Sequence, residues 1–367
     1  MRFIVSQSAL DRALAVVSKG LSAQSTNPIY TGVRVEAAEG TVELQTTNQQ
    51  ISVRHLVPAN VEEEGVCVVS GKILSNVVKN LPDAAVEFGG HDRVMEITCE
   101  KSHFRLNTLD YRDFPEFPHV DPEREVDLPS AVLSRMVDKV YRVTSKDTSR
   151  PILSGVLLTV EENTIRLVAT DSYRLAVCDT NTETSGVDSP FEVIVPGATF
   201  HDVLGLPSMT ERLTIALSES QIVFTFGNTC YVSRRIEGNY PNFRQLLPPS
   251  CTTTVTFDAS LLSQALRRVA VIALASPSVR FDVDADGGFM QLSASSPDQG
   301  EARETVPVDI QGPSTQIALN YHYVLDCATA SASDADMSLE LLSSMQPAVF
   351  KSYADINYLY LLMPVRL

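Results

Sequence analysis

The sequence predicts an α+β protein that consists of three copies of one domain, each with two helices and antiparallel sheets. Three observations support this fold class. The chain has 367 residues, which suggests two or three domains of ordinary size. Short motifs recur at an offset of 123 residues. This offset has the length of a whole domain and far exceeds the roughly 20–50 residues of a solenoid repeat. The same order of strands and helices then occurs three times.

The repeat is recognised from pairs of motifs that occur in the same order. Two pairs share the offset of 123, and the third has an offset of 126. The pairs are 27–33 (NPIYTGV) with 150–156 (RPILSGV), 47–48 (TN) with 170–171 (TD), and 113–117 (DFPEF) with 239–243 (NYPNF). A fainter third copy opens an alternating strand at Ser278, 123 residues after Gly155. Ordered matches at a nearly constant offset favour a repeat over chance matching of short motifs.

The predicted domains span residues 1–125, 126–251 and 252–367, with linkers at 121–125 and 247–250. Each domain opens with a short strand and a helical stretch whose apolar residues recur every three or four positions. The predicted N-caps of these helices are Ser8, Ser130 and Ser260. Alternating strands, a second short helix and further strands complete each domain. The six predicted helical stretches are 8–20, 71–80, 129–146, 197–205, 259–273 and 321–332.

Charge is divided unequally between these helices and the rest of the chain. With 29 Lys+Arg against 45 Asp+Glu, the net charge of -16 by itself disfavours nucleic acid as a partner. The six helical stretches, however, hold ten basic and four acidic residues, a net charge of +6, which leaves -22 for the remainder. Because salt confines a charge's influence to about 8 Å, a basic helical surface can attract duplex phosphates within an acidic protein. Amphipathic helices that merely carry Lys and Arg on their solvated faces are the alternative.

Several functions are disfavoured by absent patterns. No run approaches 18 apolar residues and no signal-peptide core is present, so a cytoplasmic protein is expected. The six cysteines lie at least 21 residues apart without a C-x-x-C, which predicts free thiols, four of them in apolar or alternating stretches, rather than a zinc or redox site. Motifs of nucleophilic, nucleotide-binding and zinc enzymes are missing, and no cofactor or metal is expected.

Asp171 is the acid that most resembles a catalytic group. Its repeat equivalent is Asn48, however, and a turn-capping role through the side-chain oxygen suits both residues. An enzyme that uses Asp171, and an acidic scaffold that binds peptides but no DNA, are the two rival hypotheses.

Four segments resemble the bacterial sliding clamps, the β subunits of DNA polymerase III. They are 168–177 (VATDSYRLAV), 238–243 (GNYPNF), 320–326 (NYHYVLD) and 363–367 (MPVRL). The resemblance extends over essentially the whole chain. It implies three DNA-clamp domains, a head-to-tail homodimer that closes a six-domain ring around duplex DNA without sequence preference, and a non-catalytic role in tethering the replicative polymerase.

The resemblance also implies which positions meet DNA. They are Gln24, Lys72, Lys79, Asp147, Pro151 and Ile152, with the cations Lys146 and Arg150 beside the last group. Relatives commonly have Arg at the first position, a neutral residue at position 147 and aromatic residues at 151–152.

A hydrophobic peptide pocket is implied between the second and third domains. Its partners would be the polymerase α subunit, the clamp-loader δ subunit and other proteins that carry clamp-binding peptides. The implied pocket residues are Leu153, Thr170, Ser172, Tyr173, Arg174, Leu175, Pro241, Gln245, Leu246, Asn320, Tyr323, Met345, Met363, Pro364, Val365 and Arg366. Relatives usually have Gly at position 172, frequently Arg at position 245, and an aromatic residue in the loop at Ser276.

The dimer interface is expected between the first domain of one chain and the third domain of another. Phe104 and Leu106 should meet Val271 and Ile272. The expected charged residues of this interface are Lys101 and Arg105 on one side and Glu301 and Glu304 on the other.

Overall fold

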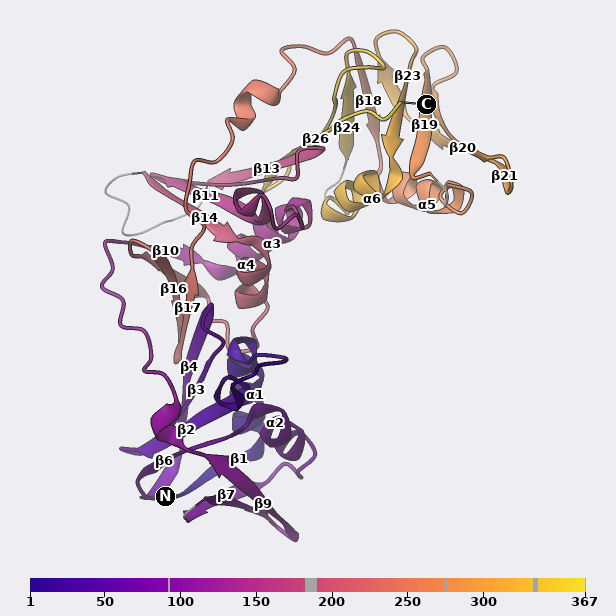
Figure 1. The fold of residues 1–367 in the computed structure, drawn as a ribbon. Helices are drawn as coiled ribbons and strands as arrows, with labels where there is room; N and C mark the ends of the chain where they lie inside the picture. The colour runs from indigo at the N-terminus through magenta and orange to yellow at the C-terminus, as the bar shows by residue number, and fades with distance from the viewer. Residues whose placement is uncertain (92, 182–189, 274–275, 333–335, 367) are drawn as a thin grey trace. The chain divides into compact units, whose positions relative to one another are not determined.

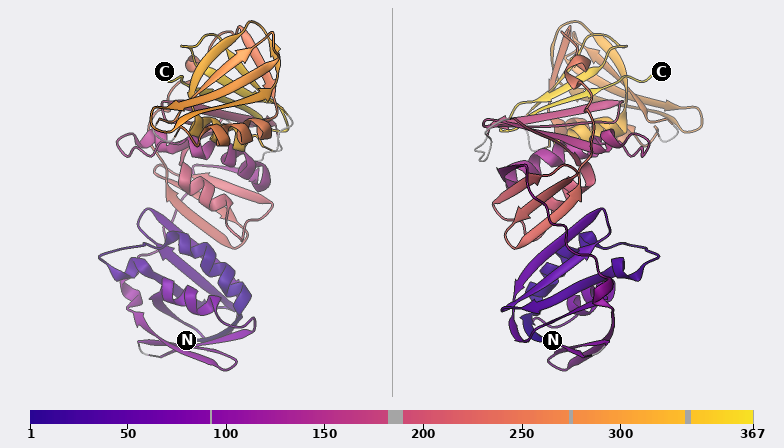
Figure 2. Two further views of the ribbon diagram at one scale, coloured as in Figure 1. Left: turned by 90° about the vertical axis from the view of Figure 1, so that its right-hand side faces the viewer. Right: turned by 60° about the vertical axis from the view of Figure 1, so that its left-hand side comes forward.

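The computed structural model describes residues 1–91, 93–181, 190–273, 276–332 and 336–366 (Figures 1 and 2). The described residues form two compact units. The first contains residues 1–133 and 202–235, and the second contains 134–181, 190–201 and 236–366. The predicted mixture of short helices and antiparallel strands is confirmed in both units.

One antiparallel sheet of thirteen strands forms the first unit. Its strands in spatial order are β10 (Arg124–Pro129), β15 (Arg212–Leu217), β16 (Gln221–Phe226), β17 (Thr229–Arg234), β4 (Ile51–Pro58), β3 (Thr41–Thr47), β2 (Gly32–Ala38), β6 (Gly65–Ser70), β9 (Ser102–Leu109), β8 (Val94–Cys99), β7 (Ala85–His91), β1 (Arg2–Ser6) and β5 (Asn60–Glu63).

The second unit contains two sheets. The nine-stranded sheet has the order β14 (Phe191–Pro196), β11 (Gly155–Glu161), β12 (Thr164–Thr170), β13 (Arg174–Asn181), β26 (Asn357–Leu362), β25 (Ala348–Ser352), β24 (Met337–Leu341), β18 (Thr253–Phe257) and β22 (Asp309–Gln311). The four-stranded sheet has the order β21 (Gly300–Pro307), β20 (Phe289–Ser296), β19 (Ser278–Asp284) and β23 (Thr315–Asn320).

Two strand pairs join the repeats. β4 of the first repeat pairs with β17 of the second, with Ser52 opposite Val232. β13 of the second repeat pairs with β26 of the third, with Leu175 opposite Leu361. Each junction therefore continues a sheet from one repeat into the next and leaves no exposed strand edge there.

Six α-helices, two in each repeat, are found among the described residues, as predicted. They are α1 (Gln7–Val17), α2 (Gly71–Lys79), α3 (Ser130–Val140), α4 (Gly197–Leu204), α5 (Ala259–Val269) and α6 (Tyr321–Ala330). Within their own units, α1 packs against α2 and α5 against α6 (Figure 1). Buried Leu10, Leu14 and Val17 form the apolar face of α1, and each such side chain contributes about 1.5–3 kcal/mol when it is removed from water.

Two of the three predicted N-caps are wrong by two residues. The side chain of Ser6, not Ser8, accepts the first-turn hydrogen bond of α1, from Ala9 N at 3.3 Å. Asp258, not Ser260, caps α5 by accepting from the backbone nitrogens of Ser260 and Leu261. Ser130 is the first residue of α3, and its hydroxyl donates to the carbonyl oxygen of Glu211 at 3.1 Å. The reason is that β1 and β18 end directly before α1 and the α5 cap, so these helices begin earlier than the apolar pattern indicated.

Four of the six cysteines are buried and none is paired, which confirms the predicted free thiols. Among the described residues, no group of three metal-binding side chains is found. No helix in the described part of the chain is long and apolar enough to cross a membrane.

Candidate functional site

The Asp171 side chain closes a turn between β12 and β13. Its Oδ1 accepts from the backbone nitrogens of Tyr173 and Arg174 at 2.9 and 3.0 Å. Asn48 closes the equivalent turn of the first repeat by accepting from Gln50 N and Ile51 N. The predicted turn-capping role is confirmed at both positions.

Ser172 occupies a backbone conformation that favours glycine. Its φ is +79°, and that of its repeat equivalent Gln49 is +74°. A left-handed φ is costly for a residue with a Cβ, whereas glycine adopts it readily. In this chain the Ser172 hydroxyl accepts a hydrogen bond from Arg150 Nη1 at 2.9 Å, an interaction that glycine cannot make.

Arg174 connects four segments beneath the predicted peptide pocket. The side chain is 7% exposed, and its Nε donates to Asp171 at 3.0 Å. Nη1 donates to Asp326 of α6 at 2.6 Å and to the Tyr360 hydroxyl of β26 at 3.1 Å. Nη2 donates to the carbonyl oxygen of Arg142, which follows α3, at 2.7 Å. The guanidinium also lies 4.1 Å from the centre of the Tyr323 ring.

Several predicted pocket residues are exposed apolar side chains. Eleven large hydrophobic side chains are exposed among the described residues, and four belong to the predicted pocket set: Tyr173, Leu246, Met345 and Met363. Buried Leu175, of the same predicted set, packs in a cluster with Phe243 and Leu361. We call the predicted pocket residues together the peptide groove; that they bind a peptide stays a prediction. Exposed apolar patches of this kind mark interaction surfaces in monomeric chains.

The other predicted groove residues have identifiable positions. Leu153 and Thr170 are buried, whereas Pro241 and Gln245 are exposed. Asn320 caps α6 by accepting from His322 N at 3.0 Å, and is therefore a structural residue as well. Met363 N donates to Tyr173 O and Val365 N to Ala318 O, which holds the C-terminal segment with Pro364 and Arg366 against the sheet. Leu367 lies outside the described residues.

Sequence reasoning missed Phe243 and Leu361, which belong to the apolar cluster around Leu175. It also missed Tyr360, whose hydroxyl accepts from Arg174 on the other face of β26. Phe243 lies in η6 (Phe243–Leu246), the 3₁₀ turn that crosses the sheet. The alternation of β26 gave a usable signal. Its even-numbered residues share the Tyr360 face, so Leu361 had to point to the opposite face, where the groove lies.

Two predicted DNA-contacting lysines share one exposed face of α2. Lys72 and Lys79 are seven residues apart, about two helical turns, so they point the same way. In the described part of the chain, neither has a carboxylate within 4.0 Å. Gln24 is exposed between η1 (Ser18–Gly20) and η2 (Pro28–Thr31), in the same unit. These positions are accessible to a polyanion.

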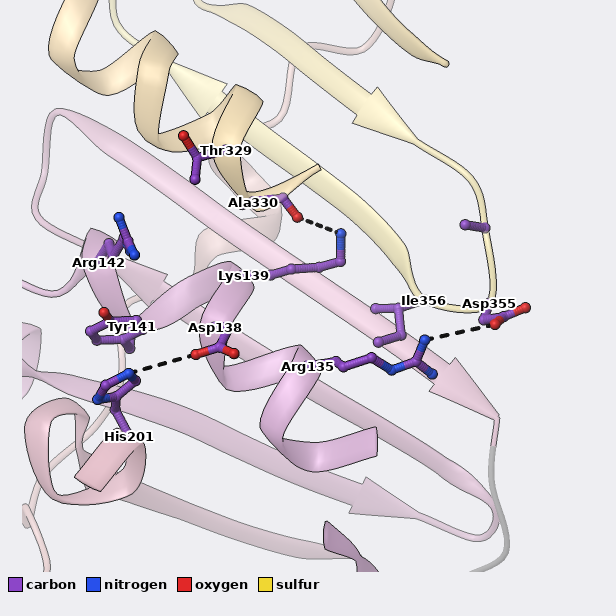
Figure 3. Close-up of a pocket in the computed structure, with 11 residues that line it drawn as sticks. Arg135, Asp138, Lys139, Tyr141, Arg142, His201, Thr329, Ala330, Asp355 and Ile356 are labelled. Carbon is purple, nitrogen blue, oxygen red and sulfur yellow. Dashed lines mark hydrogen bonds and ion pairs between the residues drawn. The ribbon is translucent and has the colours of Figure 1, made fainter. Parts of the chain in front are cut away.

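The helices are less basic than predicted. The observed α-helices hold seven basic and four acidic residues, because Lys19, Arg142 and Lys146 lie just beyond helix ends. Their net charge is +3 rather than +6. Lys139 of α3 is buried and donates to the carbonyl oxygen of Ala330 at 2.7 Å (Figure 3). Its ammonium group also lies over the Tyr358 ring. It therefore stabilises the second unit instead of facing solvent.

Figure 3 shows the cavity of about 410 Å³ beside α3, in which most charges are already paired. Arg135 lies 3.8 Å from Asp355, and Asp138 lies 3.6 Å from His201, whose ring stacks on Tyr141. Arg142 is exposed, and no carboxylate of the described residues lies within 4.0 Å of it. It is the cation of this cavity that is best placed to attract an anion.

The loop that contains the remaining predicted DNA contacts is internally paired. Asp147 accepts from the Ser149 hydroxyl and backbone and from Arg150 Nε, and these hydrogen bonds lower the pKa of its carboxyl group. Lys146 is exposed beside them. Pro151 is exposed, whereas Ile152 packs against the apolar cluster beneath the groove. The positive charge of Arg150 is thus partly offset, and Lys146 is the loop's accessible cation.

The predicted interface residues lie at two incomplete strand edges. On β9, Phe104 is 37% exposed, and only Thr108 and Leu109 pair with β6. β21 is the edge strand of its sheet, and Val271, beyond α5, is 62% exposed. Lys101 is exposed and Leu106 and Ile272 are half-buried. Three interface charges have partners within the chain: Arg105 with Glu96, Glu301 with Arg303, and Glu304 with Arg268.

Comparison with known proteins agrees with these features. Family models of the DNA polymerase III β subunit match in succession: the N-terminal domain over residues 1–118, the central domain over 127–242 and the C-terminal domain over 244–366. The β sliding clamp of Synechococcus elongatus is 28% identical over 374 residues, and that of Streptomyces coelicolor 29% over 378, with all of each chain covered.

Solved structures give the same result. The sliding clamp of Bacillus subtilis has a TM-score of 0.93 at 26% identity, covering 100% of this chain and 99% of that one. The Pseudomonas aeruginosa clamp bound to griselimycin has a TM-score of 0.93 at 25% identity, with both chains fully covered. Three clamp domains in series form a non-catalytic processivity fold. The chain belongs to the β sliding clamps, the β subunits of bacterial DNA polymerase III.

Proposed function

We propose that this sliding clamp encircles duplex DNA as a head-to-tail homodimer and tethers the replicative polymerase to its template. The observation that carries this proposal is that β9 is only partly paired on one side and β21 is an edge strand. The strands equivalent to β9 are β17 and β26, and those equivalent to β21 are β4 and β13. These strands pair across the repeat junctions, β17 with β4 and β26 with β13. A second copy of the chain can supply the missing pairing at both edges.

Equivalent aromatic residues support this assembly. Tyr231 of β17 and Tyr360 of β26, whose strands pair with a neighbouring repeat, are each 0% exposed. Phe104 is the equivalent residue of β9, because it is the third residue of its strand, as Tyr231 is of β17. Its exposure in the single chain is what a missing neighbour would produce. A head-to-tail interface of this kind forms a closed ring when its rotation closes.

The DNA contacts are proposed to be weak and blind to sequence. Lys72, Lys79 and Lys146 can approach phosphates, and described residues place no carboxylate within 4.0 Å of them. Phosphate contacts hold a protein on a duplex without reading bases. Acidic residues elsewhere repel DNA from other surfaces. The ring would keep the DNA by topology, and few contacts allow it to slide.

The peptide groove is proposed to bind short hydrophobic segments of the polymerase α subunit, the clamp-loader δ subunit and other partners. Exposed Tyr173, Leu246 and Met363 provide apolar contacts, and Met345 provides an adaptable one. We place the domain boundaries near residues 125 and 251, and the protein in the cytoplasm, in keeping with this role.

Retention on circular DNA tests encirclement. The clamp, loaded by its clamp loader, should stay on a nicked circular plasmid during gel filtration in about 0.5 M salt, where phosphate contacts are screened. Cutting that plasmid once should release it within minutes. Blocking both ends of the linear DNA with bulky protein should restore retention. Equal retention on circular and unblocked linear DNA would contradict encirclement.

A further inference from the structure

A second cavity, of about 450 Å³, lies beside η6 on the nine-stranded sheet. Val177 and Leu359 from adjacent strands line it, with Phe243 and Leu247 from the crossing segment. Cys178 points the other way, since its sulfur contacts the Met136 carbonyl oxygen of α3. Alternation therefore places Val177 on the face away from α3. Cavities of this size hold small ligands or one to two side chains.

This cavity and the peptide groove are two ends of one apolar strip. Leu175 and Val177 are successive residues on this face of β13, and Leu361 and Leu359 are successive residues on this face of β26. Phe243 packs in the same cluster as Leu175, Val177 and Leu361. The strip therefore continues from the groove, beneath η6, into the cavity.

The entrance of the cavity carries one uncompensated cation. Lys351 is neutralised by Glu340, with both oxygens at 2.7 Å, and Arg166 lies 3.7 Å from Asp179. The Arg244 guanidinium instead lies 4.9 Å from the centre of its neighbour's ring, Phe243, and no carboxylate of the described residues is within 4.0 Å of it. Exposed Tyr353 stands at the same entrance. The apolar walls can contact a bulky apolar side chain of a ligand, and Arg244 can pair with a carboxylate next to that side chain.

We propose that the cavity is a second anchor site for the protein whose hydrophobic motif occupies the groove. It receives an aromatic or large aliphatic side chain, with an adjacent acidic residue on Arg244, from a segment that flanks the motif. The inference rests on the proposed peptide groove. Met363 and Leu359 are four strand positions apart, about 13 Å, so roughly five to eight extended residues suffice to pass over η6. Linking two weak contacts in this way raises affinity through effective concentration.

Synthetic peptides and the full-length dimer test the proposal. The probes are a hydrophobic pentapeptide for the groove and the same peptide extended, at either end, by a six-residue Gly/Ser spacer and Phe-Asp-Glu. Fluorescence polarisation should show about tenfold tighter binding of one extended peptide, corresponding to about 1.4 kcal/mol. Arg244→Glu, and Leu359→Phe, which fills the cavity, should each remove that gain and leave pentapeptide binding within about twofold. No gain for either extension, or a gain that survives both variants, would overturn the proposal.

Arg112→Glu is the matched control. Arg112 also lies on a 3₁₀ turn beside its neighbour's ring, 5.8 Å from the centre of Tyr111, in the other unit. It should keep the full gain. If the pentapeptide itself does not bind, the groove assignment fails. The cavity is then judged by a benzophenone placed at the Phe of the extension. Cross-links to residues 243–247 or 353–359 support the site, and cross-links only elsewhere, or none, refute it.

Discussion

Arg174 shows how one side chain supports both the domain junction and the groove above it. Its hydrogen bonds join β13, the segment after α3, α6 and β26. Removing one partner of a buried ion pair costs about 3–5 kcal/mol, because the remaining charges lose their compensation. Lysine cannot replace the planar guanidinium, which donates to four acceptors at once. Peptide binding and junction stability should therefore fail together.

Arg174→Ala should lower the free energy of unfolding by about 3 kcal/mol, and Arg174→Lys should recover only part of it. Urea denaturation followed by circular dichroism measures both. Arg280→Ala, which removes a 43% exposed arginine paired with Asp282, is the control and should cost less than about 1 kcal/mol. Equal losses in the two alanine variants would show that the Arg174 network is not a stabilising one.

The cysteines predict a reactivity pattern. Burial raises the pKa of Cys67 to about 12 and raises the pKa of Cys178 and Cys327 above the usual value. At pH 8 only about one Cys67 thiol in 10⁴ is then ionised. Exposed Cys251 should react with a disulfide reagent in seconds, and all six thiols only in urea. The fast phase should vanish in Cys251→Ser, and its persistence would contradict the assignment.

The same shifts set a pH dependence. Because these thiols hold their protons more tightly in the folded state, the folded state binds more protons than the unfolded chain above about pH 8.5. Their contribution to stability is full below that pH and is lost as the pH rises toward the folded-state values. The urea midpoint should therefore fall between pH 8 and pH 10, and less so in a Cys178→Ala variant.

At the level of the helices, apolar periodicity predicted all six elements, because each helix buries one face against a sheet. The ends were harder to predict. Asp258 and Ser6 act as caps because strands β18 and β1 stop there, which local patterns do not reveal. Lys139 looked like a solvated cation, but an aliphatic stem and a nearby carbonyl acceptor allow it to be buried. Counting charges on predicted helices therefore overestimated the basic surface.

The exposed lysines of α2 lead to a prediction at this scale. Lys72→Ala/Lys79→Ala should weaken binding of the clamp to a short duplex and lower the slope of log K against log salt by about 1.8, since each phosphate contact contributes about 0.9. Fluorescence anisotropy at several salt concentrations gives the slope. Arg112→Ala/Arg234→Ala removes two exposed arginines outside the α-helices and should leave the slope unchanged. If both double variants behave alike, α2 does not contact DNA.

At the level of the whole molecule, the repeat predicted three similar domains, and the resemblance implied how they assemble. Neither showed the pairing of β4 with β17 or β13 with β26, because strand register depends on contacts between segments far apart in the chain. The side-chain cluster of Phe243, Leu175 and Leu361 was hidden for the same reason. Once these pairings are known, the equivalence of the repeats predicts the same pairing between β9 of one chain and β21 of another.

The transferred register predicts which residues meet across the ring interface. Ser52 is opposite Val232, and Leu175 is opposite Leu361. On β21 the residue that corresponds to Leu175 is Glu301. Glu301 pairs with Ser295 across the β20–β21 hairpin, and Leu175 pairs with Thr170 at the same place in the β12–β13 hairpin. On β9 it is Arg105, the fourth residue of its strand, as Val232 is of β17. Arg105 and Glu301 should therefore face each other in both interfaces of the dimer.

A charge exchange tests this register. Arg105→Glu and Glu301→Arg each place like charges opposite one another, which costs up to about 1 kcal/mol per interface and should raise the dimer dissociation constant roughly 30-fold over two interfaces. The double variant Arg105→Glu/Glu301→Arg restores opposite charges and should recover most of the affinity, a coupling that additive effects cannot produce. Sedimentation at several protein concentrations measures each constant. Glu219→Arg, an exposed acid in the turn between β15 and β16, should leave the dimer intact. If the double variant loses as much dimer affinity as the two single variants together, Arg105 and Glu301 do not face each other at the interface.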